Sequence, residues 1–404
     1  MTHARRRGEA VLALLAVIVV AAAVPLYFAF IPYHVHTDPA AVPSTTDDVH
    51  IATPIAAVEE SRRHARALLV EENLPGLSVA VAVDGSIVWA EGFGYADVGH
   101  SPVTPLTRFR LGALSKPLTS TAAALLHDRG RLDLDAPVQR YVPAYPSKQW
   151  MVTTRQLLRD VGGVHRIRGD NNDAMPAEHC ESLDDAVAML HDDPLMFEPG
   201  TEHRYSVWGW VLVSAAIEGA AGEPFDRFMM RQVFEPLDMD RTSPAETRGL
   251  DDVASYNAGS VLRAQFGIKK TSLPPDYSCV AGGGAFLSTP SDLVRFGSAM
   301  LKPGLLKADT LATFQTPVRL TSGTSTTYAL GWTVGTVELA GKPARIVSHR
   351  GNPRGGTVSL LTFPDLGLVV AAAANVSSAG GVNPFALRLA DVFTRHQERG
   401  PHPK

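Results

Sequence analysis

The chain has 404 residues, of which 45% are hydrophobic and 19% charged, and its formal net charge is −4. This length suits one large domain or two interleaved ones, and the composition allows a sizeable buried core. No concentrated basic face marks a nucleic-acid-binding protein, so we expect no nucleic-acid partner.

The first element is an uncharged apolar stretch, residues 10–32, which follows three arginines. About 20 apolar residues span a bilayer as a helix, whereas the apolar part of a signal peptide is roughly 7–15 residues long. We therefore predict an uncleaved single-pass membrane anchor. The arginines keep residues 1–9 in the cytoplasm and place the rest outside, in the periplasm or at the cell surface. Residues 33–52, rich in Pro, Thr, Asp and Ala, are predicted to form a linker.

The globular part begins with a predicted helix and hairpin. Ala56–Glu72 places its charged residues on one side and Ala, Val and Leu on the other, which indicates a helix. Leu77–Val83 alternates like a strand, and Ile87–Phe93 is the returning strand. Between them, Asp84-Gly85 is typical of a tight hairpin turn.

The middle of the chain, to about Val280, is predicted to be helical and rich in loops. Helices are expected there at Thr119–Asp128, Leu183–Leu190 and Gly209–Ala221. A further helix is expected after this region at Leu293–Leu301, where Thr289 caps its start. The last third returns to strands, at Tyr328–Val337, Ala344–Ser348, Thr357–Phe363 and Leu368–Ala374, followed by a final helix at Phe385–Phe393.

Strands at both ends around a helical middle predict an α/β fold of the α+β type. One antiparallel sheet would be built from both chain ends, flanked by helices, with a helical subdomain inserted between them. We expect one domain over 53–398. Its sheet subdomain covers about 53–112 and 285–398, and its helical subdomain about 113–284.

The two cysteines, Cys180 and Cys279, match no zinc or redox spacing. We interpret them as unpaired small residues of the core or of loops. A disulfide is permitted if the domain is extracytoplasmic, but the sequence does not bring the two together. His165, His179 and His191 lie in the same polar region without a standard ligand spacing, so we expect no metal. No phosphate- or dinucleotide-binding motif is present, and no cofactor is expected.

Four segments have an order and spacing shared with one family. They read FRLGALSKPLTS at 109–120, FEPGTEHRYSVWGWVLVSAAIEGAAG at 197–222, AGGGAFLSTPSDLVRFGSAM at 281–300 and SHRGNPRGGTVSLLTFP at 348–364. Together they resemble the serine β-lactamase, penicillin-binding protein and D,D-peptidase superfamily, above all class C β-lactamases and LACTB-like proteins. The resemblance covers about residues 53–395 and implies a β-lactamase/transpeptidase-like fold.

The resemblance also implies a chemistry, in which a serine attacks an acyl group and a lysine one helical turn later removes its proton. A tyrosine shares the proton transfer, and backbone N–H groups stabilise the oxyanion. Carried over to this sequence, the lysine is Lys116, the tyrosine is Tyr205, and the third motif supplies His349 and Gly351. The serine position, three residues before the lysine, holds Ala113.

Further positions of the expected binding cleft depart from the family pattern. Val207 replaces a small amide or hydroxyl residue, Arg350 replaces a hydroxyl residue, and Asn352 replaces a glycine or small residue. Leu157–Val164, read as LLRDVGGV, differs from the family's Leu-Leu-Ser-His-Thr-Ser-Gly. Ser115 lies two residues from the serine position, turned by roughly 200° on a helix, and is predicted to pack or cap. Arg350 either recognises a carboxylate or closes an obsolete cleft.

These departures leave three explanations of Ala113 open. The favoured one is a natural pseudoenzyme of the cell envelope, whose cleft binds peptide or acyl ligands such as a peptidoglycan stem peptide. The alternative is an active acyl-serine hydrolase, of peptidase, esterase or β-lactamase type, whose serine was mutated to alanine. In a third explanation, Lys116 or Tyr205 activates water. Without a serine partner, Lys116 has either a binding role or a purely structural one.

Overall fold

The computed structural model describes residues 34–46, 55–166, 179–245 and 276–398, with the isolated positions 19, 21, 253, 256–257 and 269–270. Apart from two positions, the membrane helix predicted over 10–32 lies outside these residues. In the described part of the chain, no helix has both the length and the apolar character needed to cross a bilayer.

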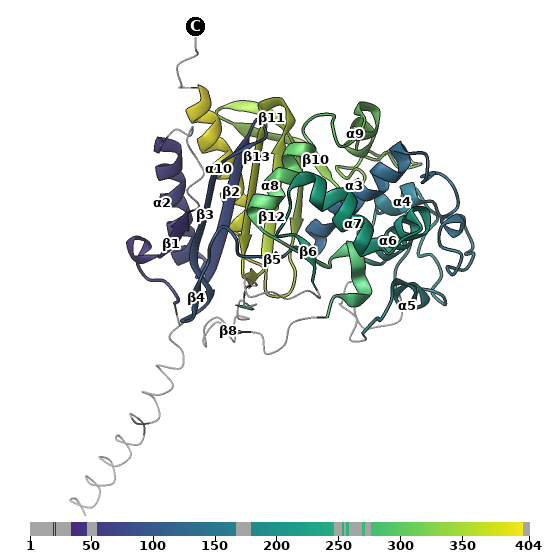
Figure 1. The fold of residues 1–404 in the computed structure, drawn as a ribbon, viewed down its shortest axis with the longest axis horizontal. Helices are drawn as coiled ribbons and strands as arrows, with labels where there is room; N and C mark the ends of the chain where they lie inside the picture. The colour runs from purple at the N-terminus through teal and green to yellow at the C-terminus, as the bar shows by residue number, and fades with distance from the viewer. Residues whose placement is uncertain are drawn as a thin grey trace, which may run out of the picture.

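An eight-stranded antiparallel sheet forms the centre of the fold (Figure 1). Its strands are β1 Ser44–Thr46, β2 Gly76–Val83, β3 Ser86–Asp97, β4 Ser101–Pro102, β10 Thr333–Leu339, β11 Lys342–Gly351, β12 Thr357–Phe363 and β13 Leu368–Ala374. The order is β1-β3-β2-β13-β12-β11-β10, with β4 paired to β3. Strand β2 from the start of the chain pairs with β13 from its end. The predicted antiparallel sheet built from both chain ends is therefore confirmed.

Helices cover both faces of this sheet (Figure 1). On one face lie α2 Ile55–Glu71 and α10 Val382–Glu398, and on the other lies α8 Pro290–Ala299. The helical region beyond α8 contains α3 Ser115–Asp128, α4 Thr154–Leu158, α5 Leu183–Ala188, α6 Trp208–Ala221, α7 Phe225–Met229 and α9 Ala308–Phe314.

Short elements connect these layers. The 3₁₀ turns are η1 Pro39–Ala41, η2 Gly112–Leu114, η3 Val138–Arg140, η5 Glu235–Leu237, η7 Ser278–Gly283 and η8 Pro364–Leu366, and η4 Met230–Phe234 is a π-helical turn. One small sheet contains β5 Phe109–Arg110, β6 Ser243–Pro244 and β9 Phe286–Ser288. Another contains β7 Tyr256–Asn257, β8 Lys269–Lys270 and β14 Val376–Ser377.

Strand β13 shows how the sequence specifies a sheet covered on both faces. Its alternate residues belong to two different cores, Val369, Ala371 and Ala373 toward the helical region, and Leu368, Val370, Ala372 and Ala374 toward α2 and α10. Because neither face meets water, the strand is an unbroken apolar run rather than an alternating one. Gly297 of α8 packs directly on Val369, where a Cβ would approach to 2.6 Å.

Two local sequence signals are also confirmed. Asp84 and Gly85 both have positive φ, 50° and 88°, as a two-residue hairpin turn matching the strand twist requires. At the start of α8, the N–H of Asp292 donates to Thr289 Oγ1 at 3.1 Å, which satisfies a donor that the first helical turn leaves open.

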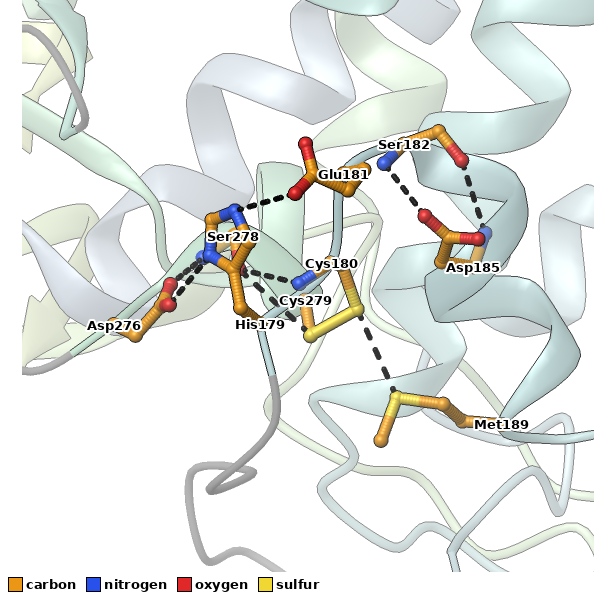
Figure 2. Close-up of a disulfide and its surroundings, with 9 residues drawn as sticks. All are labelled: His179, Cys180, Glu181, Ser182, Asp185, Met189, Asp276, Ser278 and Cys279. Carbon is orange, nitrogen blue, oxygen red and sulfur yellow. Dashed lines mark hydrogen bonds and ion pairs between the residues drawn. A yellow bond between two sulfur atoms is a disulfide. The ribbon is translucent and has the colours of Figure 1, made fainter.

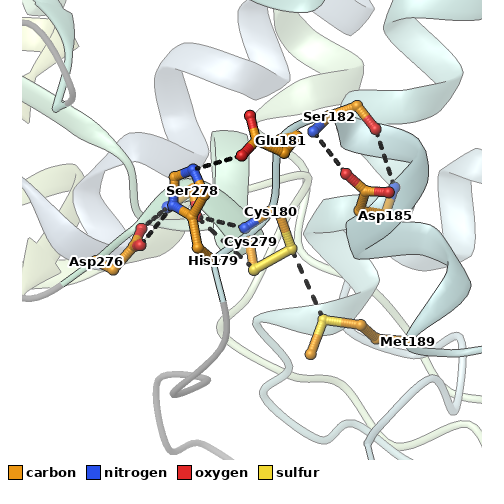
Figure 3. A network of polar contacts seen from close by, with 9 residues as sticks. All are labelled: His179, Cys180, Glu181, Ser182, Asp185, Met189, Asp276, Ser278 and Cys279. Atoms are coloured by element: carbon orange, nitrogen blue, oxygen red, sulfur yellow. Dashed lines mark hydrogen bonds and ion pairs between the residues drawn. A yellow bond between two sulfur atoms is a disulfide. The ribbon is translucent and has the colours of Figure 1, made fainter.

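The interpretation of the cysteines as unpaired is wrong, because Cys180 and Cys279 form a disulfide (Figure 2). The bridge ties the segment before α5 to η7, across 99 residues of sequence. Figure 3 shows the polar contacts around it. The N–H of Cys180 donates to Ser278 Oγ at 3.0 Å, and His179 Nδ1 lies 2.7 Å from Asp276 Oδ2. Two segments distant in sequence are thus joined at one point by a covalent bond and by polar contacts.

Candidate active site

Ala113 lies in η2, the single turn that leads into α3, and its side chain is partly exposed. Gly351 at the end of β11 packs on the carbonyl of Leu111, where a Cβ would collide with the oxygen. Gly112 has φ +51°, and a Cβ there would lie 2.9 Å from Pro353. Both contacts require glycine, and they hold the end of β11 against the start of α3, beside Ala113.

Lys116, in the first turn of α3, is fully buried. Its Nζ donates to Asp160 Oδ2 at 3.3 Å and to the carbonyl of Ser206 at 3.0 Å. The same nitrogen lies 3.5 Å from the centre of the Tyr205 ring and 5.4 Å from that of Trp210. Aromatic faces attract cations, so all four neighbours favour a charged ammonium at this point.

The end of α4 carries Asp160 to its position. The N–H of Asp160 donates to the carbonyl of Leu157, and the N–H of Val161 donates to that of Gln156. This is the Schellman arrangement that ends many helices, and it places one residue in the left-handed region. Asp160 is that residue, with φ 53°, and aspartate tolerates this conformation better than most residues.

The Asp160 carboxylate is fixed at both oxygens, because Trp210 Nε1 donates to Oδ1 at 3.0 Å while Lys116 contacts Oδ2. Burial raises the pKa of Asp160, and the Lys116 ammonium and the Trp210 indole oppose that rise. Both charged side chains are 0% exposed, so water does not screen their attraction. The sequence marks Asp160 as a departure from the family pattern that favours a pseudoenzyme, but it does not predict the contact with Lys116. The sequence signal that could have pointed to this site residue is an acidic residue in the mostly apolar stretch Leu157–Val164.

His349 of β11 lies in the same buried network. Its Nδ1 is 2.8 Å from the carbonyl of Arg350 and therefore carries the hydrogen, and its Nε2 is 3.4 Å from the Tyr328 hydroxyl. Burial, assisted by the positive charge of Lys116, lowers the pKa of His349 to about 3. Burial and the Asp160 charge raise the pKa of Tyr328 well above its usual range. Both side chains are therefore neutral near pH 7.

Tyr328 is a site residue that sequence reasoning missed. The sequence predicts a strand over Tyr328–Val337, but β10 begins only at Thr333. Gly331 has φ +81°, and the N–H of Ala329 donates to the carbonyl of Trp332. The chain therefore makes a tight turn at these residues, and Tyr328 points to His349 instead of continuing the strand.

Acid is expected to destabilise the fold through His349. Its pKa is about 3 in the folded chain against an ordinary 6.5, so below pH 6.5 the unfolded chain binds a proton that the folded chain does not. This contribution is complete above pH 6.5 and is lost as the pH falls toward 3. The loss between pH 6.5 and 4 should be about 3 kcal/mol.

Urea unfolding of the unaltered chain and of His349→Gln at both pH values measures this effect. Other groups, such as Glu60 with a pKa of about 2, lower stability in both proteins and cancel in the comparison. An equal loss of stability in the two proteins would contradict the assignment to His349.

The other predicted cleft residues take different positions. Ser115 is buried, and its Oγ accepts the N–H of Phe286 at 3.3 Å, so it packs inside. Val207 precedes α6 and packs against Gly283. Arg350 is exposed and alternates with His349 along β11, so the two side chains point to opposite faces of the sheet.

Arg350 and Asn352 line a hollow of about 240 Å³ together with Ser359 and, from α10, Asn383. This hollow lies on the face of the sheet that α10 covers. The structure thus brings Lys116, Tyr205 and His349 together, and it gathers Arg350 and Asn352 in a separate place.

The sequence profile of the Beta-lactamase family matches residues 61–392. The human serine beta-lactamase-like protein LACTB, mitochondrial, is 30% identical over an alignment covering 84% of this chain and 80% of that protein. A penicillin-binding protein of Bacillus subtilis (strain 168) is 28% identical over 76% of this chain and 70% of that protein.

Solved structures give the same picture of the architecture. An octameric penicillin-binding protein homologue from Pyrococcus abyssi superposes with a TM-score of 0.68 at 22% identity, covering 84% of this chain and 77% of that chain. A D-stereospecific amidohydrolase from Streptomyces sp. gives a TM-score of 0.67 at 22% identity. The superposition covers 82% of this chain and 97% of that chain. At such identities the likeness is one of fold.

Proposed function

The chain belongs to the Beta-lactamase family, and from this premise we propose that it is a membrane-anchored protein of the cell envelope whose cleft binds peptide or acyl ligands without forming an acyl-enzyme. The resemblance of residues 109–120 to the family's first motif supports a nucleophile position three residues before Lys116. That position lies in η2, the turn before α3 and beside the end of β11, and Ala113 occupies it.

The missing nucleophile carries the proposal. Alanine offers no group that can bond to an acyl carbon, and removing the serine from a serine hydrolase typically costs on the order of 10⁶ in kcat. The surroundings of Lys116 support the same conclusion, because its ammonium is engaged by Asp160 and by the carbonyl of Ser206. A base that serves acyl transfer needs a free lone pair.

The proposed location has two supports. The apolar stretch over 10–32 has the length and flanking charges of an anchor that leaves the domain outside the cytoplasm. The disulfide between Cys180 and Cys279 is independent of that stretch, and such bonds persist in oxidising compartments. The proposed ligand is a peptidoglycan stem peptide or another acyl compound. This class is supported by the names of the relatives, one of which is called penicillin-binding.

Binding without turnover is the expected result when the full-length chain is purified from membranes. A synthetic stem peptide should give saturable heat in calorimetry and be recovered intact by mass spectrometry. Neither fluorescent penicillin nor a fluorophosphonate should label the chain covalently. Ala113→Trp, which adds a large side chain at this partly exposed position, should weaken peptide binding at least tenfold, whereas Lys302→Ala on the exposed surface should not.

Two outcomes would contradict the proposal. Cleavage of the peptide by the unaltered chain would show turnover through another group. Rapid labelling of Ala113→Ser, with ester hydrolysis restored by that change alone, would favour a hydrolase that has lost only its serine.

A further inference from the structure

We infer that Asp160 is a built-in counter-ion that holds Lys116 as an ammonium, so that serine at position 113 alone does not restore acyl transfer. Asp160 is a positioning residue in this sense, because it acts only through Lys116. The inference rests on the proposed function and adds a second, independent cause of inactivity to Ala113.

The chemistry of a serine probe shows why the charge of Lys116 matters. In Ala113→Ser treated with a fluorophosphonate, the seryl oxygen forms a bond to phosphorus and fluoride leaves with the electron pair of the P–F bond. The seryl proton must pass to a base, and Lys116 is the amine one helical turn away. An ammonium has no lone pair to receive that proton, so the reaction waits for Lys116 to lose one.

Three features of the structure keep the counter-ion in place. Asp160 Oδ2 lies 3.3 Å from Lys116 Nζ with both side chains 0% exposed. The other carboxylate oxygen accepts the Trp210 indole N–H at 3.0 Å, which prevents the group from turning away. The backbone of Asp160 is fixed by the Schellman bonds that end α4. An opposite charge this close favours the charged form of its partner.

The remaining neighbours of Lys116 act in the same direction. The carbonyl of Ser206 accepts a second N–H, and the face of the Tyr205 ring lies 3.5 Å from the nitrogen. Neither the carbonyl nor the ring face withdraws a proton from the ammonium at neutral pH. Asp160 is the neighbour whose charge a substitution can remove without changing shape.

The test compares Ala113→Ser with Ala113→Ser/Asp160→Asn in the full-length chain. Asparagine suits the left-handed backbone of Asp160, and its carbonyl oxygen can still accept from Trp210. The second-order rate of fluorophosphonate labelling at pH 7 should rise at least tenfold in the double variant. The pH at which the rate is half-maximal should fall by about 1–3 units. A merely structural role of Asp160 would leave that pH unchanged.

Ala113→Ser/Asp292→Asn is the matched control, because Asp292 is also a buried aspartate but lies at the start of α8, bonded to Thr242. Its labelling rate should equal that of Ala113→Ser. Equal rates and equal pH midpoints with and without Asp160 would overturn the inference, while leaving binding without turnover by the unaltered chain untouched. Labelling of the unaltered chain would instead overturn the proposed function.

A second measurement needs no altered Asp160. In the unaltered chain labelled with ¹⁵N-lysine, the Nζ signal of Lys116, assigned with Lys116→Arg, should keep the chemical shift of an ammonium up to about pH 9, since an ordinary lysine titrates near 10.4. Conversion to the neutral amine below about pH 8 would overturn the inference, whatever the folding of the Asp160 variant.

Discussion

Lys116→Met should lower the free energy of unfolding by about 3–5 kcal/mol, the usual cost of leaving one member of a buried ion pair without its partner. Methionine fills nearly the volume of the lysine stem, so lost packing contributes little. The cost arises because Asp160 is 0% exposed. Without the lysine, its carboxylate either stays charged with no opposite charge beside it or has to take up a proton. Urea unfolding at pH 7, followed by circular dichroism, measures the change.

The double variant Lys116→Met/Asp160→Leu is the control that separates charge from shape. Replacing both members of a buried pair by apolar residues of similar volume is often neutral, or even stabilising by about 1–4 kcal/mol. We therefore expect the double variant to recover most of the stability lost in Lys116→Met. Destabilisation equal to the sum of the two single changes would mean that the two side chains do not act as a pair.

The sheet could be predicted from the sequence because its signals are local and repeated. The unbroken apolar run of β13 and the Asp84-Gly85 turn each indicate their structure within a few residues. The expectation that both chain ends share one sheet follows from the order of such segments. The pairing of β2 with β13 confirms it, since these strands come from opposite ends of the chain.

In the site, only the residues that lie in the family's motifs could be predicted. The resemblance placed Lys116, Tyr205 and His349 in one cleft, and the folded chain brings them together. It gave no partner for Lys116, because the approach of Asp160 depends on how α4 ends. Tyr328 was not predicted as a site residue, because a tight turn at Gly331 takes the chain out of the predicted strand before β10 begins. Contacts between distant segments leave no periodic pattern in the sequence.

The separation of Arg350 from Lys116 follows from strand geometry that the sequence does contain. Neighbouring residues of a strand point to opposite faces, so His349 and Arg350 could not both face the same cleft. The motif resemblance set the two side by side, and the alternation separates them. For the cleft proposed near Ala113, this leaves a neutral His349 and a Lys116 paired with Asp160. We therefore expect recognition there to depend on hydrogen bonding and shape more than on a free positive charge.

Loss of the disulfide should lower the free energy of unfolding about as much as Lys116→Met does. The bridge joins Cys180 and Cys279 across 99 residues of sequence, and closing a loop of about 100 residues restricts the unfolded chain by about 4.7 kcal/mol in the chain-entropy treatment. The bridge also holds η7, whose Gly283 packs against Val207 at the start of α6. Cys180→Ser/Cys279→Ser should therefore unfold at clearly lower urea, with a loss of about 4–5 kcal/mol.

Reductant provides the matched comparison for the same bond. Dithiothreitol should destabilise the unaltered chain by a similar amount and leave the double serine variant unchanged, because that variant has no bridge to reduce. Equal stability of the unaltered chain with and without reductant would show that the bridge contributes nothing. A loss of this size would support the proposed location outside the cytoplasm, since a reducing cytosol would remove stability comparable to the whole margin of many proteins, about 5–15 kcal/mol.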